Sequence, residues 1–111
     1  MDEDFAKVFA HVLTQQILEF ERKLPADMQV GVAVGGNVIS VDFVDFLPAV
    51  GLTVLEGCSK TAVPPLSPGV FVRAFLLPEL PYPLLLAVPK AATEQRGRIQ
   101  IGFRAQESLQ A

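Results

Sequence analysis

The chain has 111 residues and a formal net charge of −3; half of its residues are hydrophobic and its mean hydropathy is +0.40. This length fits a single domain, and an overall acidic protein makes a poor general binder of nucleic acid, because that affinity comes mainly from neutralised phosphates. A domain of this size buries about 60 to 70% of its surface, so the apolar excess predicts an exposed apolar surface and a partner, most simply a second copy of the chain.

The sequence carries the pattern of neither a membrane protein nor a secreted one. Its longest nearly uncharged run, from Thr61 to Leu77, contains three prolines, whereas a spanning helix needs about 20 continuous apolar residues. Residues 2–4 are acidic, the opposite of the basic start of a secretory signal. The single cysteine, Cys58, cannot form an internal disulfide, which fits a reducing compartment. We therefore expect a cytoplasmic protein that does not bind membranes.

Residues 3–23 are predicted to form one amphipathic helix. Their apolar side chains recur every three or four residues, which places them on one side of a helix. Asp2 can cap the amino end, and Pro25 stops the helix just after Arg22 and Lys23, so charge complements the helix dipole at both ends. The residues of the apolar stripe are Phe5, Val8, Phe9, Val12, Leu13, Ile17, Phe20 and Leu24.

After Pro25 the apolar period changes to two, which is the period of a strand. Residues 30–34 and 39–43 alternate on either side of Gly35-Gly36, and such a glycine pair supplies the positive φ of a tight hairpin turn. Asp45 then falls where a core residue is due. We expect a β-bulge or the end of the strand there.

Four further segments are predicted to be strands: residues 50–55, 70–77, 84–88 and 98–104. The run 84–88 is almost wholly apolar, which predicts a central strand covered on both faces. In the last segment Ile99, Ile101 and Phe103 would face the core. The predicted fold is α+β, with one N-terminal amphipathic helix packed on an antiparallel β-sheet of five to six strands. We expect a single domain over residues 1–104 and a mobile tail over 105–111.

Few residue types that carry chemistry are present, and they are scattered. His11 lies off the apolar stripe and lacks the second ligand or orienting group that metal or base chemistry needs. Cys58, near Lys60, is interpreted as an inert thiol. Asp42 and Asp45 fall on opposite faces of a strand unless a bulge intervenes. The glycines precede no helix start of the kind that a phosphate loop requires. Because none of these residues forms a ligand set or a phosphate loop, we predict no metal and no cofactor.

The most distinctive charged group lies near the end of the chain. Residues 1–56 carry nine acidic and three basic side chains, whereas residues 57–111 carry three acidic and six basic ones. A guanidinium group suits a carboxylate or a phosphate, and Arg98, Gln100 and Arg104 are predicted to share one strand face. The plain interpretation is an edge strand kept unpaired by charge; the functional one is a strip that meets an acidic partner or a small anionic ligand. The candidate ligand-binding residues are Arg73, Arg96, Arg98, Gln100 and Arg104.

Four segments span most of residues 13–103: Phe20-Glu21-Arg22-Lys23-Leu24, Gln29-Val30-Gly31-Val32, Leu85-Leu86-Ala87-Val88-Pro89-Lys90 and Arg98-Ile99-Gln100-Ile101-Gly102-Phe103. In this order and spacing they resemble a family of short bacterial and phage-associated proteins classed only as a domain of unknown function. That family has a Gln-His pair before its penultimate strand, where this chain has apolar residues with Arg73 and Glu79. No role of the pair is carried over, and the resemblance implies no activity.

These features predict a non-enzymatic, homo-oligomeric binding protein for a partner protein or a small anionic ligand, of an inhibiting or sequestering type. Two alternatives remain open. One is a small enzyme that uses Asp42 or Asp45 with His11 or Tyr82, which would need these side chains to converge in one pocket. The other is a structural subunit of a larger assembly. Poor solubility of the isolated chain that co-expression with its partner restores would favour this alternative.

Overall fold

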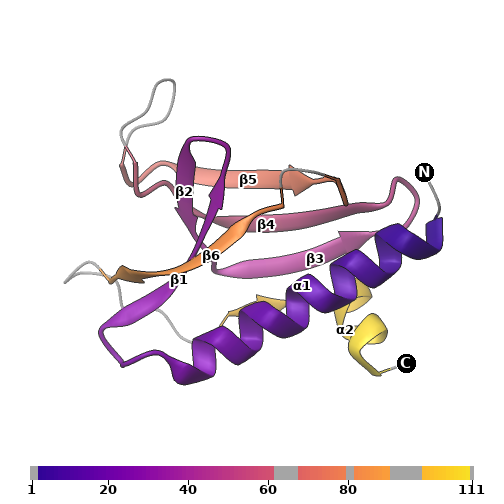
Figure 1. Cartoon of the computed structure of the whole chain (residues 1–111), viewed down its shortest axis with the longest axis horizontal. Helices are drawn as coiled ribbons and strands as arrows, with labels where there is room; N and C mark the ends of the chain where they lie inside the picture. Colours follow the sequence, from indigo (N-terminus) through magenta and orange to yellow (C-terminus); the bar gives the residue numbers. More distant parts are fainter. Residues whose placement is uncertain (1–2, 62–67, 80–81, 91–98, 111) are drawn as a thin grey trace.

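The computed structural model describes residues 3–61, 68–79, 82–90 and 99–110. A long N-terminal helix lies across two small sheets, and a short helix follows the last strand (Figure 1). The elements are α1 (Glu3–Lys23), β1 (Met28–Val34), β2 (Asn37–Ser40), β3 (Phe43–Leu47), β4 (Leu52–Cys58), β5 (Phe71–Leu76), β6 (Leu84–Pro89), β7 (Gln100–Ile101) and α2 (Phe103–Gln110).

The strands form two sheets with the orders β2-β1-β6 and β5-β4-β3-β7. All neighbours are antiparallel except β3 and β7, which run parallel. The predicted α+β class and the helix packed on antiparallel strands are confirmed. The division into two sheets was not predicted, and β6 is an edge strand with Leu84 69% exposed rather than a central strand.

The two sheets meet where β2 continues into β3. The amide of Val41 donates to the carbonyl of Val30 on β1, and the amide of the next residue, Asp42, donates to the carbonyl of Glu56 on β4. The chain therefore changes sheets between two adjacent residues. This switch is the reason for the change of phase near Asp45, where β3 pairs with β4 in regular register and the expected bulge is absent.

Gly57 allows the close approach of the backbones at this junction. A Cβ built on Gly57 would overlap the carbonyl oxygen of Ser40. The Ser40 hydroxyl also donates to the carbonyl of Cys58 at 3.3 Å and accepts from the Cys58 amide at 3.2 Å, and Ile39 forms a bridge with Ser59. These contacts hold β2 against the end of β4 and so join the sheets.

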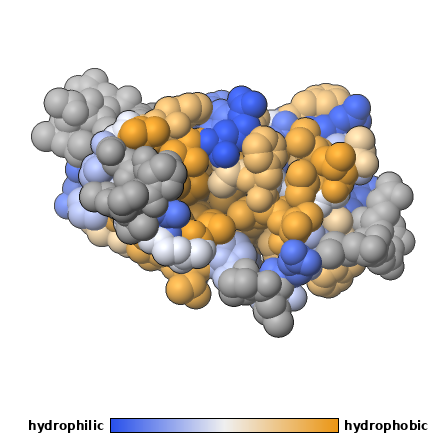
Figure 2. All heavy atoms as spheres, turned by 90° about the horizontal axis from the view of Figure 1, so that it is seen from above, coloured by the Kyte–Doolittle hydropathy of each residue, from blue (hydrophilic) through white to orange (hydrophobic). Residues whose placement is uncertain are grey.

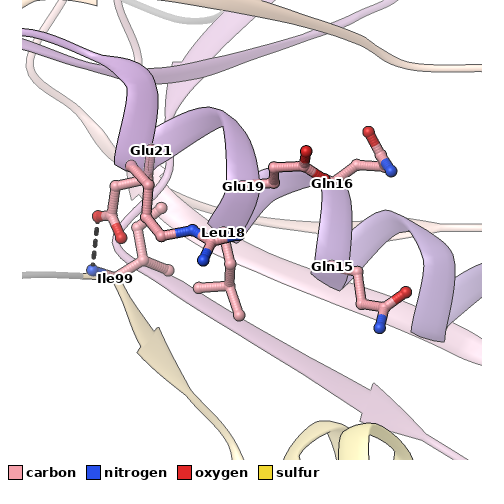
Figure 3. Close-up of a pocket in the computed structure, with 7 residues that line it drawn as sticks. Gln15, Gln16, Leu18, Glu19, Glu21 and Ile99 are labelled. Carbon is pink, nitrogen blue, oxygen red and sulfur yellow. Dashed lines mark hydrogen bonds between the residues drawn. The ribbon is translucent and has the colours of Figure 1, made fainter.

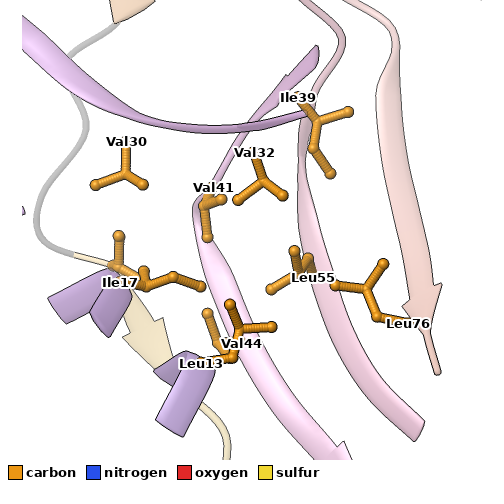
Figure 4. Close-up of a cluster of buried hydrophobic side chains, with 10 residues drawn as sticks. Leu13, Ile17, Val30, Val32, Ile39, Val41, Val44, Leu55 and Leu76 are labelled. Atoms are coloured by element: carbon orange, nitrogen blue, oxygen red, sulfur yellow. The ribbon is translucent and has the colours of Figure 1, made fainter. Parts of the chain in front are cut away.

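The larger of two buried hydrophobic clusters lies between α1 and both sheets. Leu13 and Ile17 point from α1 toward side chains of the two sheets (Figure 4). Ile17, Val32 and Leu55, which come from α1, β1 and β4, are each fully buried. Because α1 and both sheets contribute side chains to the same buried cluster, neither sheet has a core of its own. The buried cluster consists of Leu13, Ile17, Val30, Val32, Ile39, Val41, Val44, Leu55, Leu76 and Ile99.

The end of the chain differs from the predicted strand over residues 98–104. The strand β7 ends at Ile101, and residues 103–110 form α2. Ile99 is buried as expected, but Phe103 is 69% exposed and Arg104 lies on a helix. Residues after 104 were expected to form a tail without an anchor; helix α2 instead continues to Gln110, with Ala105 buried.

Asp45 caps α2. Its Oδ1 accepts hydrogen bonds from the amides of Phe46 at 2.8 Å and Ala105 at 3.1 Å. Gly102 precedes the helix, and a Cβ there would overlap the Asp45 carboxyl group. The carboxylate thus satisfies an amide that the first turn of a helix leaves unpaired, and its negative charge faces the positive end of the helix dipole. Asp45 was expected to mark a bulge or a strand end; it instead lies within β3 and caps α2.

Among the described residues, no helix is both long enough and apolar enough to cross a membrane.

Candidate functional site

Helix α1 has a wider apolar surface than the core uses. At about 100° per residue, all apolar side chains of α1 except Leu18 spread over an arc of about 200° from Val8 to Ala10. One half of the arc packs into the protein, with Ala6, Ala10, Leu13 and Ile17 buried. The other half contains Phe5, Val8 and Val12, which are 46, 57 and 47% exposed. Such a split predicts a second surface that packs against something outside the core.

An apolar groove lies beside this exposed half. Its second wall is the start of β6 with the residues before it, Tyr82, Pro83 and Leu85. The rings of Phe9 and Tyr82 stack across the groove with centroids 6.0 Å apart and planes at 30°. The groove has a volume of about 430 Å³, within the range of about 300 to 1,000 Å³ that is typical of ligand sites. The lining residues are Phe5, Val8, Phe9, Val12, Leu13, Gln16, Tyr82, Pro83 and Leu85.

The polar groups in this lining are few. The Gln16 amide and the Tyr82 hydroxyl are the only polar side-chain groups among the lining residues that the structure describes. A surface with so little hydrogen-bonding capacity suits apolar side chains, because a polar ligand would lose its water without gaining partners. The groove can therefore hold apolar side chains, and it offers no group for proton transfer except the tyrosine.

Two polar hollows, of about 510 and 520 Å³, lie at the other end of α1 and share Glu21, Arg22 and Ile99 in their linings. Glu21 points toward the backbone of Ile99, whose amide donates to its carboxylate at 3.0 Å (Figure 3). The side chains of Gln15, Gln16 and Glu19 spread along the helix in this view instead of converging. Asp42 and Lys90 line the second hollow, so its walls carry both signs of charge.

Of the three predicted ligand-binding residues that the structure describes, Arg73 lies apart from Gln100 and Arg104. Arg73 lies on β5 and Gln100 on β7, at opposite edges of the four-stranded sheet. The Nε of Arg73 donates to Glu56 at 2.6 Å, and Arg104 pairs with Glu107 at 3.4 Å. Arg104 also lies over the Phe103 ring, 5.8 Å from its centroid. Arg96 and Arg98 lie outside the described residues, and the ligand-binding role of the set stays a prediction.

The residues of the enzyme alternative also occupy different places. Asp45 caps α2, Asp42 lines the polar hollow beside Glu21, and Tyr82 stacks on Phe9 in the apolar groove. His11 lies on α1 and does not line that groove. Within the described ranges, no three residues of the metal-binding types His, Cys, Asp and Glu gather where an ion could sit.

The sequence contains a signal for the groove in the width of the apolar stripe. Phe5, Val8 and Val12 belong to the stripe predicted for residues 3–23, and a helix packed on one layer buries a narrower arc than about 200°. The arc could therefore have shown that α1 has an apolar surface to spare. The position of Tyr82 and Pro83 opposite it depends on the path of the chain into β6, which local sequence does not encode.

Searches of protein-family models, of characterised proteins and of solved structures find nothing that matches this chain, so its resemblance to the bacterial and phage-associated family stays a prediction.

Proposed function

We propose that this chain is a non-enzymatic, homo-oligomeric interaction protein that holds a short basic amphipathic helix of a partner protein in the groove between α1 and β6. The observation that carries the proposal is the exposed half of the α1 stripe beside Tyr82 and Pro83. A groove with this composition and size matches the binding of the apolar face of a helix, a common mode of peptide recognition.

The spacing along α1 supports a helical ligand. Phe5, Val8 and Val12 follow the i, i+3, i+7 pattern and cover two turns, about 10 Å at 1.5 Å per residue. A ligand helix with three apolar side chains at the same spacing can fit its ridges between those of α1. This match favours a helix over a compact small molecule.

The charge of the chain supports a basic ligand. Residues 1–56 carry nine acidic and three basic side chains, and four of the acidic and all three basic ones belong to α1. Such an imbalance attracts positively charged partners and speeds their association. A small anionic ligand is less favoured, because Arg73 and Arg104 already pair with carboxylates. The proposed ligand is therefore a helix with an apolar face flanked by lysine or arginine.

The chain contains its own optical probe for this proposal. It has one tyrosine, Tyr82, and no tryptophan, so tyrosine fluorescence reports on the groove alone. The test is a titration with a lysine-rich helical peptide that has leucines at i, i+3 and i+7 and no aromatic residue. We expect a saturable change of Tyr82 emission, and no change with a peptide in which serines replace the leucines. An equal response to both peptides would contradict the proposal.

A pair of variants on α1 localises the binding. Val12→Glu places a carboxylate in the groove wall, where bound peptide would desolvate it, and we expect a dissociation constant higher by about tenfold or more. Gln15→Glu adds the same charge at an exposed position outside the groove and should not weaken binding. Because an added carboxylate attracts a lysine-rich peptide, equal weakening by both variants would contradict binding in the groove.

A further inference from the structure

Among the residues that the structure describes, strand β5 has a strand on one side only and presents an apolar edge on the other. It is the terminal strand of its sheet. On its solvent-facing side lie Phe71, Arg73 and Phe75, which are all exposed. Apolar residues cover much of the described surface on the side where β5 lies (Figure 2). Natural edge strands are usually short, charged or covered, because an open edge can pair with another strand. One arginine is the only charged residue within β5.

The backbone pattern shows which groups of β5 remain available for pairing. The amide of Ser59 donates to the carbonyl of Val70, and the register continues as Gly57 with Val72 and Leu55 with Ala74. Backbone groups alternate between the two sides of a strand. Those of Val72 and Ala74 therefore point toward β4, and those of Arg73 and Phe75 point toward the open edge.

We infer that two copies of this chain pair along β5 in antiparallel orientation, with a two-fold axis at Ala74. This register puts Arg73 of each copy opposite Phe75 of the other, and Phe71 opposite Leu77. Both pairs are favourable, as cation–π and apolar contacts. On the other face Val72 meets Leu76, and the small Ala74 meets itself. An axis at Arg73 would instead oppose two like charges, which is unfavourable across a strand pair.

The apolar area of this edge is sufficient for a specific dimer. At about 200 Å² for a fully accessible phenylalanine side chain, Phe71 and Phe75, which are 62 and 53% exposed, contribute about 230 Å². Val70 and Leu77 are nearly half exposed and raise the apolar patch to roughly 400 Å² per copy, the size that marks interaction sites. With the Arg73 stem and the edge backbone, the two copies offer about 1,000 Å² of surface to the contact, the lower limit for a specific interface.

This inference deepens the homo-oligomeric part of the proposed function and does not depend on the groove. Its test is sedimentation velocity over a concentration series of the full chain. We expect a concentration-dependent dimer, and Phe75→Lys should raise its dissociation constant by about tenfold or more, because the new charge faces Arg73 of the second copy. Phe75→Glu removes the same ring but faces that arginine with a carboxylate, so its dimer should be tighter than that of Phe75→Lys and should weaken with salt.

The matched control is Leu84→Lys, which changes a highly exposed apolar residue on β6 and should leave the dimer intact. If Phe75→Lys leaves the dimer unchanged, pairing through β5 is overturned, although oligomer formation is not. A wild-type monomer at every concentration would overturn both, while the Tyr82 titration would still decide the groove. Circular dichroism checks that each variant is folded.

Disulfide formation tests the register itself. In the proposed dimer Ala74 opposes Ala74 as a non-hydrogen-bonded pair, with about 4.5 Å between Cα atoms, a distance at which a disulfide can form. In a Cys58→Ser background, Ala74→Cys should form a covalent dimer on oxidation, and Arg73→Cys should form far less. Preferential crosslinking of Arg73→Cys would overturn the axis at Ala74.

Discussion

Gly57 is the residue whose lack of a side chain fixes the junction of the two sheets. Since a Cβ there would overlap the Ser40 carbonyl oxygen, Gly57→Ala must push the β2 backbone away from β4. We expect the free energy of unfolding to fall by about 2 to 4 kcal/mol, in the range of overpacking and backbone strain. Urea denaturation followed by circular dichroism measures this change.

Gly36→Ala is the matched control for this prediction. A Cβ at Gly36 meets nothing within 4 Å, and Gly36 is not among the glycines with positive φ, whereas its neighbour Gly35 has φ of 62°. The substitution should change stability by less than about 1 kcal/mol. Equal losses for the two variants would mean that the junction does not depend on the close approach at Gly57.

At the scale of elements, α2 depends on a side chain that is far away in sequence. Asp45 on β3 accepts the amide of Ala105 at 3.1 Å, so Asp45→Ala should cost about 0.5 to 2 kcal/mol of stability. Asp45→Asn keeps an acceptor oxygen and should cost less, because it loses only the charge at the helix end. Hydrogen exchange of the α2 amides measures the effect, and unchanged protection in Asp45→Ala would contradict the capping role.

Helix α1 shows how one element can serve two surfaces. Ile17 is fully buried in the core, whereas Val8, on another side of the same helix, is 57% exposed. Both belong to one apolar stripe in the sequence, and hydrophobic periodicity does not separate a core side from a binding side. The structure separates them, because the sheets cover only part of the stripe and leave the rest beside Tyr82.

At the scale of the whole molecule, the two sheets and α1 share one core, so they should unfold together. We expect urea transitions followed by far-ultraviolet circular dichroism and by Tyr82 fluorescence to coincide. The first probe reports all helices and strands, and the second reports the contact between α1 and the residues that precede β6. A Tyr82 transition at clearly lower urea would show that this wall of the groove opens separately from the core.

Much of the fold could be predicted from the sequence, and much less of the candidate site. The helix over residues 3–23 and the hairpin at Gly35-Gly36 follow from local periodicity and turn chemistry, and both are present. The strand predicted through Arg104 was wrong after Ile101. The alternation of residues 98–103 continues into a segment whose conformation is decided by Asp45, 60 positions away from Ala105.

The sequence by itself determined the α+β class, the amphipathic helix and the apolar excess, because each of these depends on composition or on residues within a few positions of one another. The tertiary structure decided the division into two sheets, the position of β5 at an open edge, and the groove between α1 and β6. These features arise from pairing and packing between distant segments, and their energies depend on which surfaces meet rather than on local preference.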